Sequence, residues 1–267
     1  MNYRHIYHAG SFADVFKHAI LVFLVKALQQ KDKGFCYIDT HAGIGYYDLS
    51  DPRVSRNPEY LSGIVKAISD SPANSLLQPY LEVIQANNPR SKLTHYLGSP
   101  AIVYQLLRPQ DEMVINELHP DDALHLKQSL PADPRVHIHQ RDAYEFLPGV
   151  LPPTLNRGII LIDPPYEISN EYTQIKHVLN KAVKRFKQGV YVLWYPIKSS
   201  EHQSYLKSII NQSQCPHLNL ELKLKSHSIQ QELIGCGMLI LNPPWKIEET
   251  LTPICNYLQK LFGASEF

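Results

Sequence analysis

Phe35–Gly45 (FCYIDTHAGIG) joins an apolar run to an acidic residue and then to a turn with two glycines. An apolar run of this kind, closed by a turn, is typical of a strand buried in a parallel sheet. In open parallel sheets, ligands bind beside the carboxyl ends of the strands, where glycine lets a ligand approach the backbone. The stretch therefore predicts a central strand with a ligand site at its end.

Apolar runs of the same kind recur along the chain, and each ends in polar or turn residues: Met113–Glu117, Val136–Gln140, Gly158–Asp163 and Val190–Tyr195. Segments with helical spacing of apolar residues lie between several of the runs; the clearest are Ala13–Leu28 and Tyr172–Phe186. This alternation predicts an α/β fold with a mostly parallel sheet.

The last two strands differ from the others. Leu218–Leu224 and Gly237–Leu241 leave no room for a crossover helix between them, so we expect them to pair antiparallel. Five parallel strands followed by an antiparallel pair form the seven-stranded pattern of Rossmann-like, class I S-adenosylmethionine-dependent methyltransferases. That step is an analogy of fold, and fold alone does not establish function.

Residues 46–91 interrupt the alternation, because they carry no strong strand signal and contain five prolines. Tyr60–Ile68 and Leu76–Ala86 have helical patterns. We predict a helical insertion subdomain over 46–91, and a main domain formed by 1–45, with its N-terminal helix, and by 92–267.

Composition sets the remaining bounds. The chain has 267 residues and a net charge of +1, so a nucleic-acid partner has to be held by local basic patches. The four cysteines form no close pair and show no zinc spacing. We find no apolar signal region and no membrane-spanning apolar run. These features predict a reduced, cytoplasmic enzyme.

The glycine turn favours S-adenosylmethionine as the cofactor. Gly43 and Gly45 lack the third glycine of a dinucleotide fingerprint, and the acidic residue precedes the turn. Glu117, at the end of the second strand, is placed to accept hydrogen bonds from both ribose hydroxyls. Asp142, after the third strand, is placed to accept from the adenine amine, and Ala143 offers its backbone. Each carboxylate has an alternative role as a helix N-cap or in a solvated turn.

Asp163-Pro164-Pro165-Tyr166 is the strongest motif in the chain. An adenine N6 amine is a poor nucleophile, because its lone pair is delocalised into the ring. The Asp163 carboxylate and the Pro164 carbonyl can accept its two hydrogens, and the two prolines hold that carbonyl rigidly. Tyr166 supplies a flat face for an extruded base. In-line displacement at a sulfonium methyl needs no metal.

Asn242-Pro243-Pro244-Trp245 is a second motif of the same kind. Too few residues follow it for the rest of a parallel sheet, whereas the fifth strand and the terminal pair fit after Tyr166. We therefore place Asn242 at the end of the last strand and assign catalysis to Asp163.

Other polar residues carry weaker signals. His137 and His139 share a strand face, but no third metal ligand of matching spacing appears. Four histidines become candidates for the cofactor site if the N-terminal helix packs over the cofactor: His5, His8, His18 and His41. Basic residues are candidates for phosphate contact; they comprise Arg4, Arg53, Arg56 and those between Lys176 and Lys187.

Several motifs together resemble the ribosomal large-subunit methyltransferase J family nearly end to end: Tyr3–His5, His8–Gly10, Ala13–Val15, Lys17-His18, Asp39–Gly43, Gly98–Pro100, Glu117–Pro120, Asp163–Glu167, Leu193–Pro196 and Asn242–Lys246. The resemblance implies a Rossmann-like fold with a small helical insertion. It also implies methylation of N6 of one adenine in 23S rRNA, free or partly assembled, by a monomer. Methylation of DNA and a non-catalytic role in the use of external DNA remain alternatives.

The resemblance also implies site residues by position. S-adenosylmethionine would be bound by His18, His41, Ser99, Glu117, Asp142, Ala143 and Asp163. Asp163 would also be the catalytic acceptor, and Tyr3 would contact substrate RNA from the N-terminal tail.

Overall fold

The seven-stranded sheet predicted from the sequence is present in the computed structural model, which describes residues 4–70, 76–89, 92–168, 170–198, 201–224 and 233–263. Its strand order is β5 (Val136–His139), β4 (Glu112–Asn116), β1 (Cys36–Asp39), β6 (Gly158–Ile162), β7 (Val190–Ile197), β9 (Gly235–Leu241) and β8 (His217–Lys223). The strands from β5 to β7 are parallel, and β9 pairs antiparallel with both β7 and β8. The predicted fold class and the antiparallel terminal pair are confirmed.

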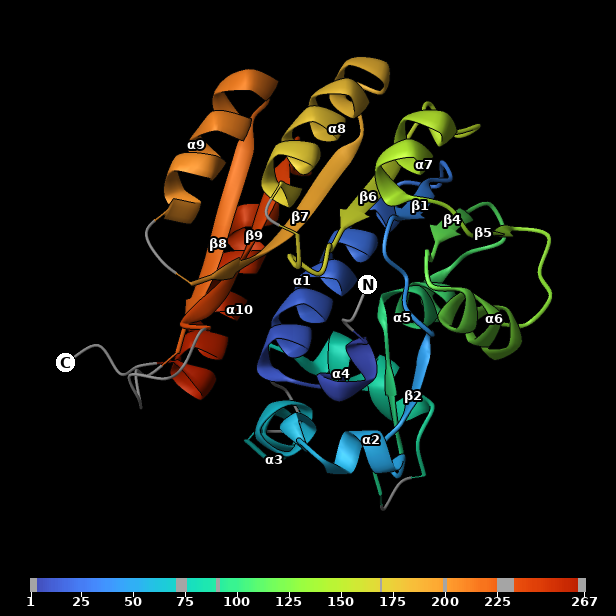
Figure 1. The fold of residues 1–267 in the computed structure, drawn as a ribbon, viewed down its shortest axis with the longest axis vertical. Coiled ribbons are helices and arrows are strands. Elements are labelled where there is room, and N and C mark those ends of the chain that lie inside the picture. The colour runs from blue at the N-terminus through green and yellow to red at the C-terminus, as the bar shows by residue number, and fades with distance from the viewer. Residues whose placement is uncertain are drawn as a thin grey trace.

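Helices cover both faces of the sheet (Figure 1). Successive residues of a strand point to opposite faces, so Ile159 packs in one core cluster and Ile160 in the other. The first cluster includes side chains of α1 (Phe12–Gln29), α5 (Ser99–Leu106), α6 (Pro120–Ser129) and α10 (Ile247–Phe262). The second includes side chains of α7 (Ala143–Val150), α8 (Glu171–Arg185) and α9 (Glu201–Ser213). No helix within the described ranges is long and apolar enough to cross a membrane.

The N-terminal helix α1 is buried along almost its whole length. Ser11 caps it by accepting a hydrogen bond from the Asp14 N–H, and a single-turn helix, η1 (His5–Tyr7), precedes it. Its apolar side chains belong to the core cluster shared with α5 and α10. Two buried residues of this helix, Asp14 and Lys17, are charged and therefore need partners.

The segment 46–91 contains several short helical elements. It contains α2 (Pro52–Ser55), the π-helical turn η2 (Leu61–Val65), α3 (Lys66–Asp70) and α4 (Gln78–Ala86). It also contains a strand that the sequence did not signal: β2 (Tyr46–Asp48) pairs antiparallel with β3 (His95–Leu97), which lies beyond the predicted insertion. Strands of three residues are too short to show a period of two. The division into domain and subdomain stays a prediction.

The two proline-containing loops lie at opposite edges of the sheet. Asp163 follows β6, whose last residue, Ile162, pairs with Leu193 of the parallel strand β7. Asn242 follows the antiparallel strand β9, whose last residue, Leu241, pairs with Tyr191 near the start of β7. Asn242 thus lies at the end of the last strand, as predicted, and at the amino edge of the parallel strands.

Candidate active site

A cavity of about 900 Å³ lies at the carboxyl edge of the parallel strands. Its wall combines residues from α1, from the turn after β1, from the start of α5 and from the loop after β6. Most of the site residues expected from the sequence line it: His18, His41, Ser99, Glu117, Asp163, Pro164 and Tyr166.

Glu117 joins the glycine turn to the end of β4. One carboxylate oxygen accepts from the Gly43 N–H at 2.9 Å, and the other accepts from the His119 N–H at 2.8 Å. Burial raises the pKa of Glu117, and the two backbone hydrogen bonds oppose that rise. Gly43 has φ +63°, and a Cβ atom there would overlap the Tyr47 hydroxyl. Each carboxylate oxygen can accept a second hydrogen bond, for example from a ribose hydroxyl.

Asp39 holds two residues of the cavity wall, Ser99 and His41. It is fully buried and accepts from the Tyr37 hydroxyl at 2.7 Å, the Ser99 hydroxyl at 2.6 Å and the His41 N–H at 3.1 Å. Burial raises the pKa of Asp39, while these hydrogen bonds lower it. The Ser99 hydroxyl is thus engaged, but Ser99 begins α5, whose N-cap, Gly98, supplies no side-chain cap. The first N–H groups of α5 can therefore receive an anionic group such as a carboxylate.

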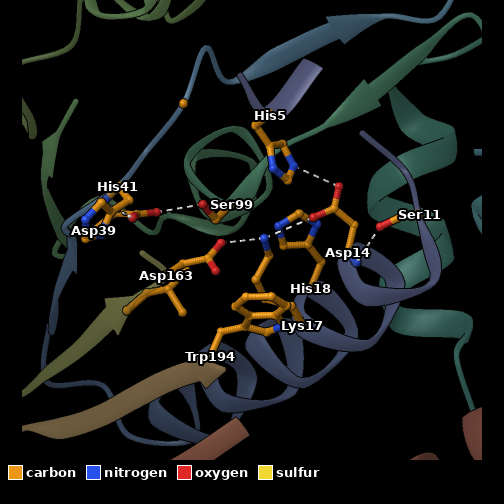
Figure 2. Close-up of polar contacts among 12 residues, drawn as sticks. His5, Ser11, Asp14, Lys17, His18, Asp39, His41, Ser99, Asp163 and Trp194 are labelled. Carbon is orange, nitrogen blue, oxygen red and sulfur yellow. Dashed lines mark hydrogen bonds and ion pairs between the residues drawn. The ribbon is translucent and has the colours of Figure 1, made fainter. Parts of the chain in front are cut away.

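A chain of alternating charges connects α1 to the loop after β6 (Figure 2). Lys17 Nζ lies 2.6 Å from an Asp163 oxygen and 3.0 Å from an Asp14 oxygen, and Asp14 is also 3.0 Å from His5 Nε2. Lys17 is only 5% exposed. Burial alone would raise the pKa of Asp14, but His5, Lys17 and His18 hold it well below its usual value.

Lys17 and Asp14 have no role among the sequence predictions. They stand three positions apart in a mostly apolar helix, and this spacing is the signal that could have identified them, because charges on the buried side of a helix need partners.

Two histidines on the cavity wall, His18 and His41, are neutral at pH 7. Burial, followed by the charge of Lys17, holds the pKa of His18 well below its usual value; its Nδ1 lies 2.6 Å from the Tyr96 hydroxyl. Burial lowers the pKa of His41 to about 4. Because His18 belongs to α1, the N-terminal helix contributes to the cavity wall. Within the described ranges, no three His, Cys, Asp or Glu residues are grouped to hold a metal ion.

The Asp163–Tyr166 loop brings an acceptor and an aromatic ring to one wall of the cavity. Tyr166 has φ +55°, an unusual backbone conformation for a non-glycine residue. Its hydroxyl donates to the Trp194 carbonyl at 2.8 Å, and the two rings lie 6.0 Å apart.

The other predicted site residues that the structure describes lie outside the cavity wall. Asp142 caps α7 by accepting from the N–H groups of the next turn, which is the alternative role that the sequence left open. Ala143 is buried beside it. Arg4 pairs with Asp122 at 2.6 Å, beside a smaller cavity of about 60 Å³. Tyr3 lies outside the described residues. The roles of these four residues stay predictions.

The sheet order and the cavity at the carboxyl edge define a Rossmann-like class I methyltransferase fold. The chain belongs to the family described as ribosomal RNA large subunit methyltransferase D, RlmJ, whose model matches residues 32–266.

Known proteins resemble the chain over nearly its whole length. Two relatives named ribosomal RNA large subunit methyltransferase J come from Escherichia coli and Haemophilus influenzae. They are 36% and 34% identical over 97% of this chain, and the matches cover 92% and 93% of the relatives. The crystal structure of protein LPL1258 from Legionella pneumophila is 34% identical, with a TM-score of 0.88, and the match covers 97% of this chain and 96% of that one.

Proposed function

We propose that the protein transfers a methyl group from S-adenosylmethionine to N6 of an adenine in 23S rRNA. The observation that carries the proposal is the position of the Asp163–Tyr166 loop, on the same cavity wall as Glu117, His18 and His41. Family membership and the names of the relatives support ribosomal RNA as the substrate. A cytoplasmic monomer acting on free or partly assembled 23S rRNA is the corresponding expectation.

The polar groups of the cavity fit S-adenosylmethionine. Glu117 would accept from the ribose hydroxyls, and the start of α5 at Ser99 would receive the carboxylate of the methionine part. His18 and His41 are neutral at pH 7, so these two rings would not repel the sulfonium. Asp142 and Ala143 remain candidates for the adenine. The bound cofactor supplies an electrophilic methyl group.

The loop would activate the amine. Asp163 and the Pro164 carbonyl accept hydrogen bonds from the two N6 hydrogens. These bonds concentrate the lone pair on nitrogen and direct it at the methyl carbon. With the cofactor bound, the nitrogen–carbon bond would form as the sulfur–carbon bond breaks, the bonding electrons would stay on sulfur, and the surplus N6 proton would pass to Asp163 and then to solvent. Asp163 has to turn from Lys17 toward the amine, and Lys17 then keeps Asp14 as its partner.

The test compares nucleic acids directly. The protein is incubated with labelled S-adenosylmethionine and either unmodified 23S rRNA or a DNA oligonucleotide that matches its adenine-containing stretches. We expect label in N6-methyladenosine from the RNA. Preferential labelling of DNA would support the alternative substrate, because no contact between the loop and the sugar is predicted. Failure to bind S-adenosylmethionine in calorimetry would instead favour a non-catalytic role.

A further inference from the structure

A buried carboxylate stands directly behind the proposed catalytic loop. Glu171 is the first residue of α8 and is only 4% exposed, although its side chain carries a charge. One oxygen accepts from the Glu167 N–H at 2.9 Å, and the other accepts from the Tyr144 hydroxyl at 2.7 Å. A charge at this depth is costly unless it is paired or hydrogen-bonded, and both contacts lead to segments that border the site.

The first contact restrains the strained part of the loop. Glu167 follows Tyr166, whose φ of +55° is unfavourable for a non-glycine residue and persists only where the surroundings impose it. Two hydrogen bonds flank that residue: the Tyr166 hydroxyl is held by the Trp194 carbonyl, and the next N–H is held by Glu171. Without the Glu171 contact, the backbone can relax and carry the ring and the Pro164 carbonyl out of place.

The second contact reaches the segment after β5, part of which is predicted to bind the cofactor. Tyr144 follows Asp142 and Ala143, both predicted to contact the cofactor adenine, and its N–H donates to Asp142 at 2.9 Å. Its ring also lies 6.3 Å from that of His41, edge to face. Glu171 thus links the segment after β5 to the loop after β6 through two hydrogen bonds.

We propose that Glu171 is a positioning residue that holds the Asp163–Tyr166 loop in its reactive geometry. This proposal rests on the proposed function, because the position of the loop matters only if the loop performs the reaction. The side chain itself does not line the cavity, so it acts only through Glu167 and Tyr144.

The kinetic test measures kcat per S-adenosylmethionine-binding site, counted by calorimetry. We expect Glu171→Ala to lower kcat by up to about 100-fold, because small displacements at a reacting centre have effects of that order. The dissociation constant for S-adenosylmethionine should stay unchanged. Glu171→Gln keeps one acceptor oxygen and should rescue part of the loss, and Tyr144→Phe, which spares the loop contact, should lose least.

Glu145→Ala is the matched control, since Glu145 is an exposed glutamate in the first turn of the neighbouring helix α7. Equal kcat in the Glu171→Ala and Glu145→Ala variants would overturn the proposal. A loss of activity that disappears when kcat is calculated per S-adenosylmethionine-binding site would overturn it too. If Glu171→Ala does not fold, Glu171→Met, which can accept neither hydrogen bond, takes its place, and wild-type kcat in that variant would overturn the proposal.

A fluorescence readout separates this proposal from the proposed function. The chain has two tryptophans, so Trp245→Phe leaves Trp194, beside Tyr166, as the only one. We expect Glu171→Ala in that background to make Trp194 more accessible to acrylamide, whether or not RNA is methylated. Unchanged quenching would overturn the proposal even if the wild-type protein is active. An inactive wild type with increased quenching would count against the proposed function alone.

Discussion

The two proline-containing loops are alike in sequence and differ in almost every structural respect. In Asp163–Tyr166 the acidic residue pairs with a buried lysine and borders the large cavity. In Asn242–Trp245 the amide nitrogen of Asn242 donates to the carbonyls of Lys187 and Gly189, which closes the end of β9. Trp245 is 89% exposed, whereas Tyr166 packs beside Trp194.

Strand direction explains the difference. β6 is parallel to its neighbours and delivers its loop to the edge where β1 and β4 also end. β9 is antiparallel to β7 and delivers its loop to the opposite edge. The role of such a four-residue motif therefore depends on the direction of the strand before it, because ligands of these sheets bind at the carboxyl edge of the parallel strands.

The largest expected contrast is catalytic. Asp163→Asn should lower kcat by about 10²–10³-fold, because it removes a charged acceptor aimed at the amine. Asn242→Asp at the other loop should leave kcat unchanged in the folded protein. Single-turnover assays with labelled S-adenosylmethionine measure both. Comparable losses from the two substitutions would contradict the assignment.

The charged residues beside the two loops should differ in their effect on stability. Lys17→Met leaves the buried Asp14 carboxylate without its lysine, and we expect the free energy of unfolding to fall by about 3 kcal/mol. Lys246→Met removes a pair in which Lys246 is 60% exposed and Glu249 is 70% exposed, and we expect a change of at most about 0.5 kcal/mol. Urea unfolding measures both values. Similar losses would show that Lys17 is not a buried pairing residue.

The pH dependence of stability should also separate the two edges. The pKa of His41 in the folded state is about 4, below its unfolded value of about 6.5. The unfolded chain therefore takes up a proton between these values that the folded protein does not, so stability falls as pH falls through this window. His41→Asn should remove this contribution, so the variant should lose roughly 2 kcal/mol less stability than the wild type between pH 7 and pH 5.

His217→Asn is the control for that experiment. His217 is exposed and pairs with Leu241, next to the second loop, so this variant makes the same substitution outside the cavity and at the opposite edge of the sheet. Denaturant midpoints at the two pH values, measured for each variant, give the answer. A wild-type pH dependence in His41→Asn would contradict burial of that ring.

The smallest contrast concerns the aromatic residues. Tyr166→Phe keeps the ring and loses the hydrogen bond to the Trp194 carbonyl, so we expect a loss of about 1 kcal/mol in the free energy of unfolding. Trp245→Phe should change it hardly at all, because the side chain is almost fully exposed. Thermal or urea unfolding resolves the two. A larger loss from the Trp245 variant would reverse this ranking.

The sheet could be predicted from sequence because buried parallel strands leave continuous apolar runs. The strands Tyr46–Asp48 and His95–Leu97 could not be predicted, because three residues are too few to show an alternating pattern. In the site, Glu117 and Asp163 could be found because each directly follows a strand of the predicted sheet. The ion pair between Lys17 and Asp163 could not, since it joins residues 146 positions apart and depends on how α1 packs.

Mass spectrometry of 23S rRNA tests the central claim most directly. A strain that lacks this protein is complemented with the wild type, with Asp163→Ala or with Asn242→Ala, each confirmed to be folded and present in equal amount. We predict that one N6-methyladenosine disappears in the deletion strain and returns with the wild type and with Asn242→Ala. Asp163→Ala should not restore it. An unchanged modification in the deletion strain, or full restoration by Asp163→Ala, would contradict the account.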